Sequence, residues 1–142
     1  MGQTHETVIK RRIPATPEAV FNAWTDAEGM TKWLAISGRV SADIRTGGKF
    51  EIDMQHERKV YPHHGEFLRV EPPSLIEFTW FSEGTQQQRS VVTVELRDVV
   101  GETELILTHR GLPTVKSAND HWEGWTRIIG QLKDVLTKRK AA

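Results

Sequence analysis

The C-terminal part of the sequence carries the pattern that most restricts the fold. Apolar residues recur there at spacings of three and four over about six helical turns, namely Val115, Ala118, Trp122, Trp125, Ile129, Leu132 and Leu136. This spacing predicts one long amphipathic helix over residues 117–138, which begins with a capping box formed by Ser117 and Asp120. Such a helix must bury its apolar stripe, so the remaining chain must supply a surface of matching length.

The sequence before this helix favours strands. Residues 49–54 alternate strictly between polar and apolar side chains, as in a half-buried strand. Similar segments are found at residues 7–13, 39–43, 60–71, 75–80, 90–98 and 104–110. The six segments that begin at residue 39 are joined by short connections without helices. This arrangement predicts an antiparallel sheet of six or seven strands.

Two short helices are predicted after the first strand. Thr16 supplies an N-cap hydroxyl and Pro17 a first-turn proline for a helix over residues 17–24, and Asp26 caps a second over residues 26–34. Because three helices cannot cover both faces of seven strands, we expect an α+β fold whose curved sheet wraps around the long helix. A gap between helix and sheet is then a natural position for a cavity.

The composition excludes several classes of function. The 19 basic and 19 acidic residues give a net charge of zero, which disfavours a nucleic-acid or acidic-membrane partner. No apolar segment approaches the ~20 residues that span a bilayer, and the absence of cysteine excludes disulfides and thiolate chemistry. The N-terminal residues do not resemble a secretory signal, so we expect a single domain over residues 1–142 in the cytoplasm.

Several local strings occur in the order found in a known family. They are ATPEAVF at 15–21, AWTD at 23–26, Trp33, GGKF at 47–50, residues 65–71 before Pro72 and Pro73, FTW at 78–80, residues 103–109 followed by GLP at 111–113, and HWEGW at 121–125. Through these strings the chain resembles the START-like SRPBCC superfamily. Within it, the chain is similar to single-domain proteins that resemble the C-terminal domain of the activator of heat-shock-protein-90 ATPase.

The resemblance implies a helix-grip (START/Bet v-like) fold that binds apolar or amphipathic small molecules under the long helix. Side chains on the stripes directed towards this gap are the candidate lining residues: Trp33, Met54, Phe78, Trp80, His109, His121, Trp122 and Trp125. Aromatic faces offer apolar contact, and an indole N–H can orient a ligand. Plain core packing would also bury such residues, so both interpretations remain open.

No metal site or cofactor is predicted. His63 and His64 are adjacent on a strand and point to opposite faces, so they cannot chelate as a pair and are interpreted as surface histidines. Gly124 and Gly130 each destabilise a helix interior by roughly 1 kcal/mol relative to alanine. Close approach of the sheet, a kink, or space for a ligand would each explain these glycines.

The leading functional hypothesis is a cytoplasmic carrier or sensor of a small apolar or amphipathic molecule. One alternative is a cyclase- or dehydratase-like enzyme in which His109 or His121 acts with Tyr61 or a bound water as the acid–base pair. A second alternative is a protein-interaction module that contacts a chaperone, as the resemblance to the co-chaperone domain implies.

Overall fold

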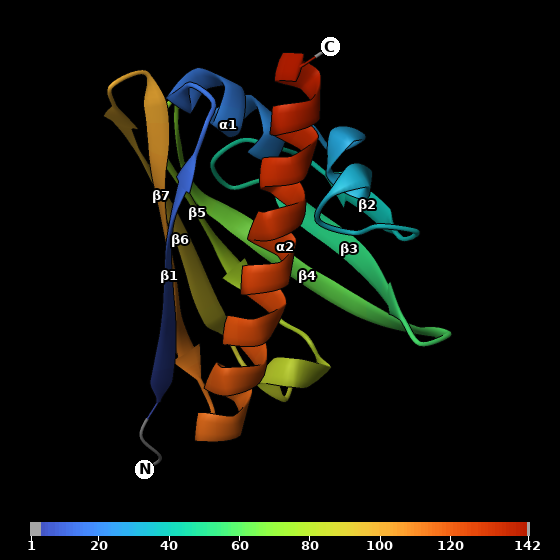
Figure 1. The fold of residues 1–142 in the computed structure, drawn as a ribbon. Coiled ribbons are helices and arrows are strands. Elements are labelled where there is room, and N and C mark those ends of the chain that lie inside the picture. The colour runs from blue at the N-terminus through green and yellow to red at the C-terminus, as the bar shows by residue number, and fades with distance from the viewer. Residues whose placement is uncertain (1–3, 142) are drawn as a thin grey trace.

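The computed structural model describes residues 4–141 and shows a curved antiparallel sheet wrapped around one long helix (Figure 1). Within these residues the strands are β1 (His5–Ile13), β2 (Arg39–Ala42), β3 (Lys49–His56), β4 (Lys59–Glu71), β5 (Leu75–Trp80), β6 (Ser90–Val99) and β7 (Glu102–Leu112). The helices are α1 (Pro17–Trp24) and α2 (Val115–Ala141), with 3₁₀ turns η1 (Gly29–Lys32) and η2 (Glu83–Thr85). The predicted α+β helix-grip architecture is confirmed.

The seven strands form one sheet in the order β1-β7-β6-β5-β4-β3-β2. Consecutive strands from β2 to β7 pair with their neighbours in sequence, as short connections require. The first strand instead joins the last, with Thr7 opposite His109 and Ile13 opposite Thr103. This pairing brings the N-terminal strand beside the end of β7, from which the chain enters α2.

The first two helical segments lie between β1 and β2 and cover one end of the sheet (Figure 1). The Thr16 hydroxyl accepts a hydrogen bond from the backbone N–H of Ala19 at 3.2 Å, which confirms the predicted cap of α1. The second helix is a single 3₁₀ turn and is shorter than predicted. The Met30 carbonyl accepts the N–H groups of Trp33, Leu34 and Ala35, and this closes the turn.

The long helix α2 begins at Val115, two residues before the predicted start. The Thr114 hydroxyl accepts a hydrogen bond from the backbone N–H of Ser117 at 2.9 Å, so Thr114 and not Ser117 is the N-cap. The predicted capping box is therefore wrong. The Ser117 hydroxyl donates to the Gly84 carbonyl at 2.6 Å, and Asp120 accepts from Lys116 at 2.7 Å.

The core fills the space between the concave face of the sheet and the apolar stripe of α2. Its most completely buried members include Ile9, Ile13, Val92, Leu105, Leu107, Ile129 and Leu132. Each aliphatic side chain of this size contributes about 1.5 to 3 kcal/mol on burial. Although α2 has 27 residues, neither it nor any other helix within residues 4–141 contains an apolar stretch suited to crossing a membrane.

Candidate functional site

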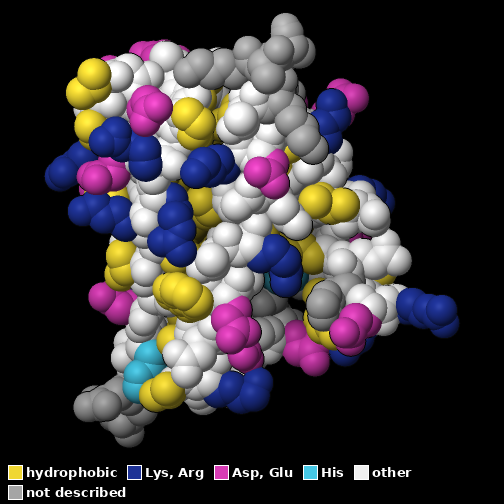
Figure 2. Space-filling view, viewed as in Figure 1, with side chains coloured by type: hydrophobic (Ala, Val, Ile, Leu, Met, Phe, Trp, Pro, Cys, Tyr) yellow, Lys and Arg dark blue, Asp and Glu magenta, His cyan; other side chains and the backbone are white. Residues whose placement is uncertain are grey.

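A cavity of about 870 Å³ opens between α2 and the sheet. Four parts of the chain form its walls: the segment after η1, strands β3 to β5, the turn around η2, and one face of α2. The surface is visibly hollowed beside α2, and basic and acidic side chains surround the opening (Figure 2). The curved sheet therefore leaves space where its β3–β5 side diverges from the helix.

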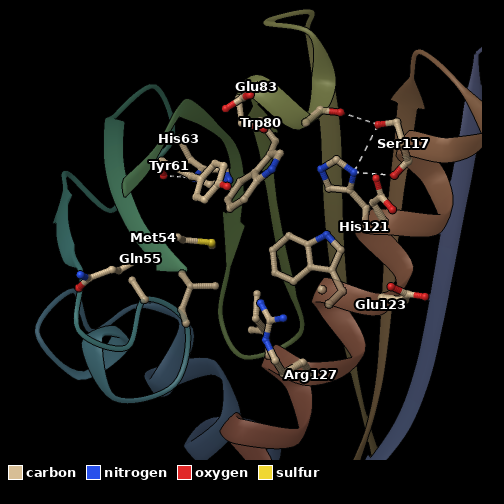
Figure 3. A pocket seen from close by; sticks show the side chains of 18 of the residues that line it. Met54, Gln55, Tyr61, His63, Trp80, Glu83, Ser117, His121, Glu123 and Arg127 are labelled. Carbon is tan, nitrogen blue, oxygen red and sulfur yellow. Dashed lines mark hydrogen bonds between the residues drawn. The ribbon is translucent and has the colours of Figure 1, made fainter. Parts of the chain in front are cut away.

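Two tryptophans form the apolar floor of this cavity. Trp80 comes from β5 and Trp125 from α2, and their ring centroids lie 5.2 Å apart. Both side chains are almost completely buried, and the thioether of Met54 faces them from β3 (Figure 3). The Trp80 indole N–H is buried and has no hydrogen-bond acceptor among the described residues.

His109 lies behind the floor and connects its two tryptophans. The Trp125 indole N–H donates to Nδ1 of His109 at 3.0 Å, so the ring proton must be on Nε2. Nε2 lies 2.8 Å from the Ser90 hydroxyl and donates to it, and this hydroxyl donates to the Trp80 carbonyl at 2.6 Å. Every polar atom of the His109 ring is thus engaged, and the ring is inaccessible to solvent.

Burial determines the charge of His109. Desolvation is the largest effect on His109, and together with charge repulsion from the neighbouring His121 and His63 it lowers the pKa of His109 to about 2. The neutral ring matches its hydrogen bonds, because a proton on Nδ1 would break the bond from Trp125. His109 consequently acts on the cavity by holding Trp125 in place.

Two other histidines line the cavity itself. Nδ1 of His63 lies 2.8 Å from the Tyr61 carbonyl, and Nδ1 of His121 lies 2.7 Å from the Ser117 carbonyl. A carbonyl only accepts, so each Nδ1 carries a proton, and each neutral ring retains a lone pair on Nε2. Burial lowers the pKa of both rings, although the backbone carbonyls oppose the shift. Both imidazoles are therefore predominantly neutral at pH 7.

Charged groups surround the mouth of the cavity. Glu83 lines the cavity and pairs with Lys59 at 3.3 Å, whereas Glu123 and Arg127 project from α2 (Figure 3). Arg127 has no ion-pair partner within the described part of the chain. No group of three or more histidine, aspartate or glutamate side chains there is arranged to hold a metal ion. The cavity thus combines an aromatic floor with a polar rim.

Four of the eight residues predicted to line a cavity do so: Met54, Trp80, His121 and Trp125. Trp33 packs in the core, edge-on to Trp24 at 4.8 Å, and Phe78 borders only a separate apolar void of about 20 Å³. His109 lies behind the wall. The expectation that these three line the cavity is corrected, because their inward faces are filled by other core residues.

Trp122 is also outside the cavity, with 44% of its surface exposed. The cavity-facing stripe of α2 runs through residues 117, 121, 124 and 128. Successive helical residues are about 100° apart, so Trp122 is turned away from this stripe. The helical spacing places Trp122 on the apolar stripe of α2, but this stripe is wider than the part of the helix that lines the cavity.

Several lining residues were not among the candidates, notably His63, Glu123 and Arg127. His63 was interpreted as a surface histidine, but it pairs with the buried Ile52 and faces the cavity. Its strand parity with the buried Phe67 was the available signal, because residues four apart on a strand share a face. Glu123 and Arg127 fall on the polar side of the helix pattern and gave no such signal.

The two helix glycines differ in their surroundings. A Cβ added at Gly124 or at Gly130 would meet no atom within 4 Å, so close approach of the sheet explains neither residue. Gly124 lines the cavity, whereas Gly130 is exposed and does not. Only at Gly124 does the missing side chain leave space in the cavity wall.

A curved antiparallel sheet that grips a C-terminal helix above a cavity places this protein in the helix-grip class. A family model described as "Activator of Hsp90 ATPase homolog 1-like protein" matches residues 14–137, and the chain belongs to this family. The mouse and human proteins "Activator of 90 kDa heat shock protein ATPase homolog 1" are 26% identical to it over 125 residues. This match covers 87% of the chain but 34% of each relative, so the chain spans about a third of their length.

Solved structures show the same fold. Protein MLL2253 from Mesorhizobium loti is 24% identical, with a TM-score of 0.80 and coverage of 94% of this chain and 98% of that one. DynU16, from the dynemicin biosynthetic locus, is 22% identical, with a TM-score of 0.80 and coverage of 93% and 47%. The resemblance to the SRPBCC superfamily and the heat-shock-protein-90 activator is thereby confirmed at the level of family and fold.

Proposed function

We propose that this protein binds a small amphipathic molecule in the cavity beside α2 and acts as its carrier or sensor. The observation that carries this proposal is a cavity of about 870 Å³ with an aromatic floor and a polar rim. Ligand pockets usually measure about 300 to 1,000 Å³ and combine apolar walls with a few polar groups. We also propose that residues 1–142 act as one domain in the cytoplasm, where a chain without cysteine loses no stabilising disulfide.

The chemistry of the walls defines how such a ligand would lie. Its apolar body would contact Trp80, Trp125 and Met54, whose burial disfavours a charged group there. Its polar end would lie among the polar lining residues, which include Tyr61, His63 and His121. An amphipathic molecule satisfies both regions, whereas a fully polar metabolite would leave the aromatic floor without a matching surface.

A pair of glycine variants tests this proposal. Gly124→Phe places a ring in the cavity, and Gly130→Phe makes the same change on the exposed side of the same helix. The probe is 8-anilinonaphthalene-1-sulfonate, followed by fluorescence titration of the folded proteins. We expect Gly124→Phe to weaken binding about 10-fold or more, equivalent to about 1.4 kcal/mol, and Gly130→Phe to leave it unchanged. Equal affinities in the two variants, or no saturable binding by the wild type, would contradict the proposal.

A cyclase- or dehydratase-like activity in the same cavity is a second candidate. His121 and Tyr61 both line the cavity, and a neutral imidazole with a free Nε2 is chemically suited to accept a proton. His109 is not suited to this role, because both of its nitrogens are engaged behind the floor. Conversion of a candidate substrate that is lost in His121→Phe, with binding retained, would support this activity.

A chaperone contact is a third candidate, favoured by membership of the activator family. The measurement is the ATPase rate of purified heat-shock protein 90 with and without this chain. Stimulation that survives Gly124→Phe would separate such a contact from ligand binding.

A further inference from the structure

We infer that the cavity selects ligands that carry a hydroxyl group, whose O–H donates a hydrogen bond to Nε2 of His121 or His63. This inference rests on the proposed function and defines its ligand class more narrowly. It follows from the way the backbone fixes the two imidazole rings, and not from the volume or apolar character of the cavity.

Both rings are held so that they can only accept at the cavity. The Ser117 carbonyl binds Nδ1 of His121, and the Tyr61 carbonyl binds Nδ1 of His63. In Figure 3 the ring of His121 extends away from Ser117 towards Trp80 and His63. Nε2 of His121 has no hydrogen-bonding partner among the described residues, whereas the ring of His63 also interacts with the Ile52 backbone. A neutral ring tied at Nδ1 has no proton on Nε2, so its partner there must bring one.

Gly84 keeps the relevant edge of His121 accessible. A Cβ at position 84 would lie 3.1 Å from Cε1 and 3.5 Å from Nε2 of His121, so any side chain would cover this edge. The Ser117 hydroxyl binds the Gly84 carbonyl at 2.6 Å and fixes the turn in this position. The η2 turn therefore borders the Nε2 atom without obstructing it.

Burial favours the neutral form of both rings. Charge repulsion from His121 also lowers the pKa of His63. Asp120 and Asp53 act in the opposite direction on His121 and His63, but desolvation is the largest effect and lowers the pKa of both. A carboxylate ligand would bring a lone pair to another lone pair, whereas an alcohol or phenol brings the missing proton.

The floor supplies a reason to prefer oxygen as the donor atom. The Trp80 indole N–H is buried beside the cavity with no acceptor among the described residues. A hydroxyl oxygen both donates one hydrogen bond and accepts others, so it complements an imidazole lone pair and an indole N–H together. We therefore assign alcohols and phenols with an apolar body as the ligand class.

Two ligands that differ only in this proton provide the test. 2-Naphthol has an O–H group, and 2-methoxynaphthalene replaces it with a methyl ether. Apolar contact alone favours the ether by about fourfold, because of its extra methyl group. The ether leaves the imidazole lone pair without a donor, which weakens its binding by about 8- to 40-fold and outweighs the extra methyl group. We therefore expect calorimetric titration of the wild type to show naphthol binding about 2- to 10-fold more tightly.

Histidine variants locate the bond. We expect the preference for naphthol to disappear in His121→Phe, in His63→Phe or in the double variant. His64→Phe is the matched control and retains it, because His64 is exposed on the opposite face of β4 and stacks on Phe81. A preference that persists in the double variant would overturn the assignment, since the O–H would then donate elsewhere.

The two ligands also separate this inference from the proposed function. If the wild type binds the ether as tightly as naphthol or more tightly, the inference is wrong and the binding function stands. If neither ligand binds, the hydroxyl preference and the proposed binding function are both wrong for ligands of this size. The comparison of ligands on the wild type decides the question even where a histidine variant fails to fold.

Discussion

His109 shows how a single buried residue shapes the cavity from outside it. Its two nitrogens connect Trp125 to Ser90 and, through that hydroxyl, to the backbone of Trp80. The ring is neutral in the fold but has an ordinary pKa of 6.5 when the chain unfolds. Below pH 6.5 the unfolded chain therefore binds a proton that the folded chain does not.

This difference predicts a loss of stability in acid. Between pH 6.5 and about 2 the free energy of unfolding should decrease as the pH decreases. His109 alone contributes about 1.4 kcal/mol per pH unit to this decrease. His63 and His121 also have lowered pKa values and act in the same direction. Urea unfolding at pH 7, 6 and 5 measures the slope. His109→Gln should reduce it and His64→Gln should not; equal slopes in both variants would contradict this account.

The candidate site was predictable in part at the residue scale. Met54, Trp80 and Trp125 follow from strand and helix periodicity, because each occupies an inward position. Periodicity cannot distinguish an inward side chain that packs in the core, as Phe78 does, from one that borders a gap. That distinction depends on where the sheet diverges from α2, which is a property of the assembled fold.

At the scale of elements, the start of α2 depends on one hydroxyl. Thr114→Ala removes the acceptor of the Ser117 N–H and should lower the free energy of unfolding by about 0.5 to 2 kcal/mol. Thr137→Ala is the control, because Thr137 is an exposed residue near the other end of the same helix. Chemical denaturation of both variants measures the difference. An unchanged free energy of unfolding in Thr114→Ala would show that another group caps the helix.

The elements themselves were largely predictable, because alternation and capping are local patterns. The strands appear within a few residues of their expected bounds, and β5 matches its range fully. The start of α2 was misplaced because Thr114 and Ser117 are both hydroxyl residues that can cap a helix. The contact that engages Ser117 is with Gly84, and no local pattern connects these two positions.

At the scale of the whole molecule, ligand binding and folding stability are linked. A molecule that binds only the folded state should raise the free energy of unfolding by about 2.7 kcal/mol at 100 times its dissociation constant. We therefore expect 2-naphthol to raise the unfolding midpoint of the wild type and of Gly130→Phe. Differential scanning calorimetry measures the shift. A similar increase in Gly124→Phe would place the ligand outside the cavity.

The overall architecture was predictable because few arrangements satisfy its pattern. Strands without intervening helices require antiparallel pairing, and a single long apolar stripe requires a concave surface. The pairing of β1 with β7 joins segments from opposite ends of the chain and was not predicted, because no local pattern connects them. The volume of the cavity depends on sheet curvature, which the sequence does not express locally.

The hydrogen-bonded chain through Trp125, His109, Ser90 and Trp80 has a consequence for how this lineage can change. Replacing His109 alone leaves the Trp125 indole N–H without an acceptor, and a buried group of this kind destabilises a protein by about 1 to 3 kcal/mol, whereas the Ser90 hydroxyl keeps its bond to the Trp80 carbonyl. Replacing the polar partners together with apolar groups of similar shape is far less damaging. Across descendants, these positions are expected to be inherited as a unit and exchanged as a unit, with the cavity floor preserved in either case.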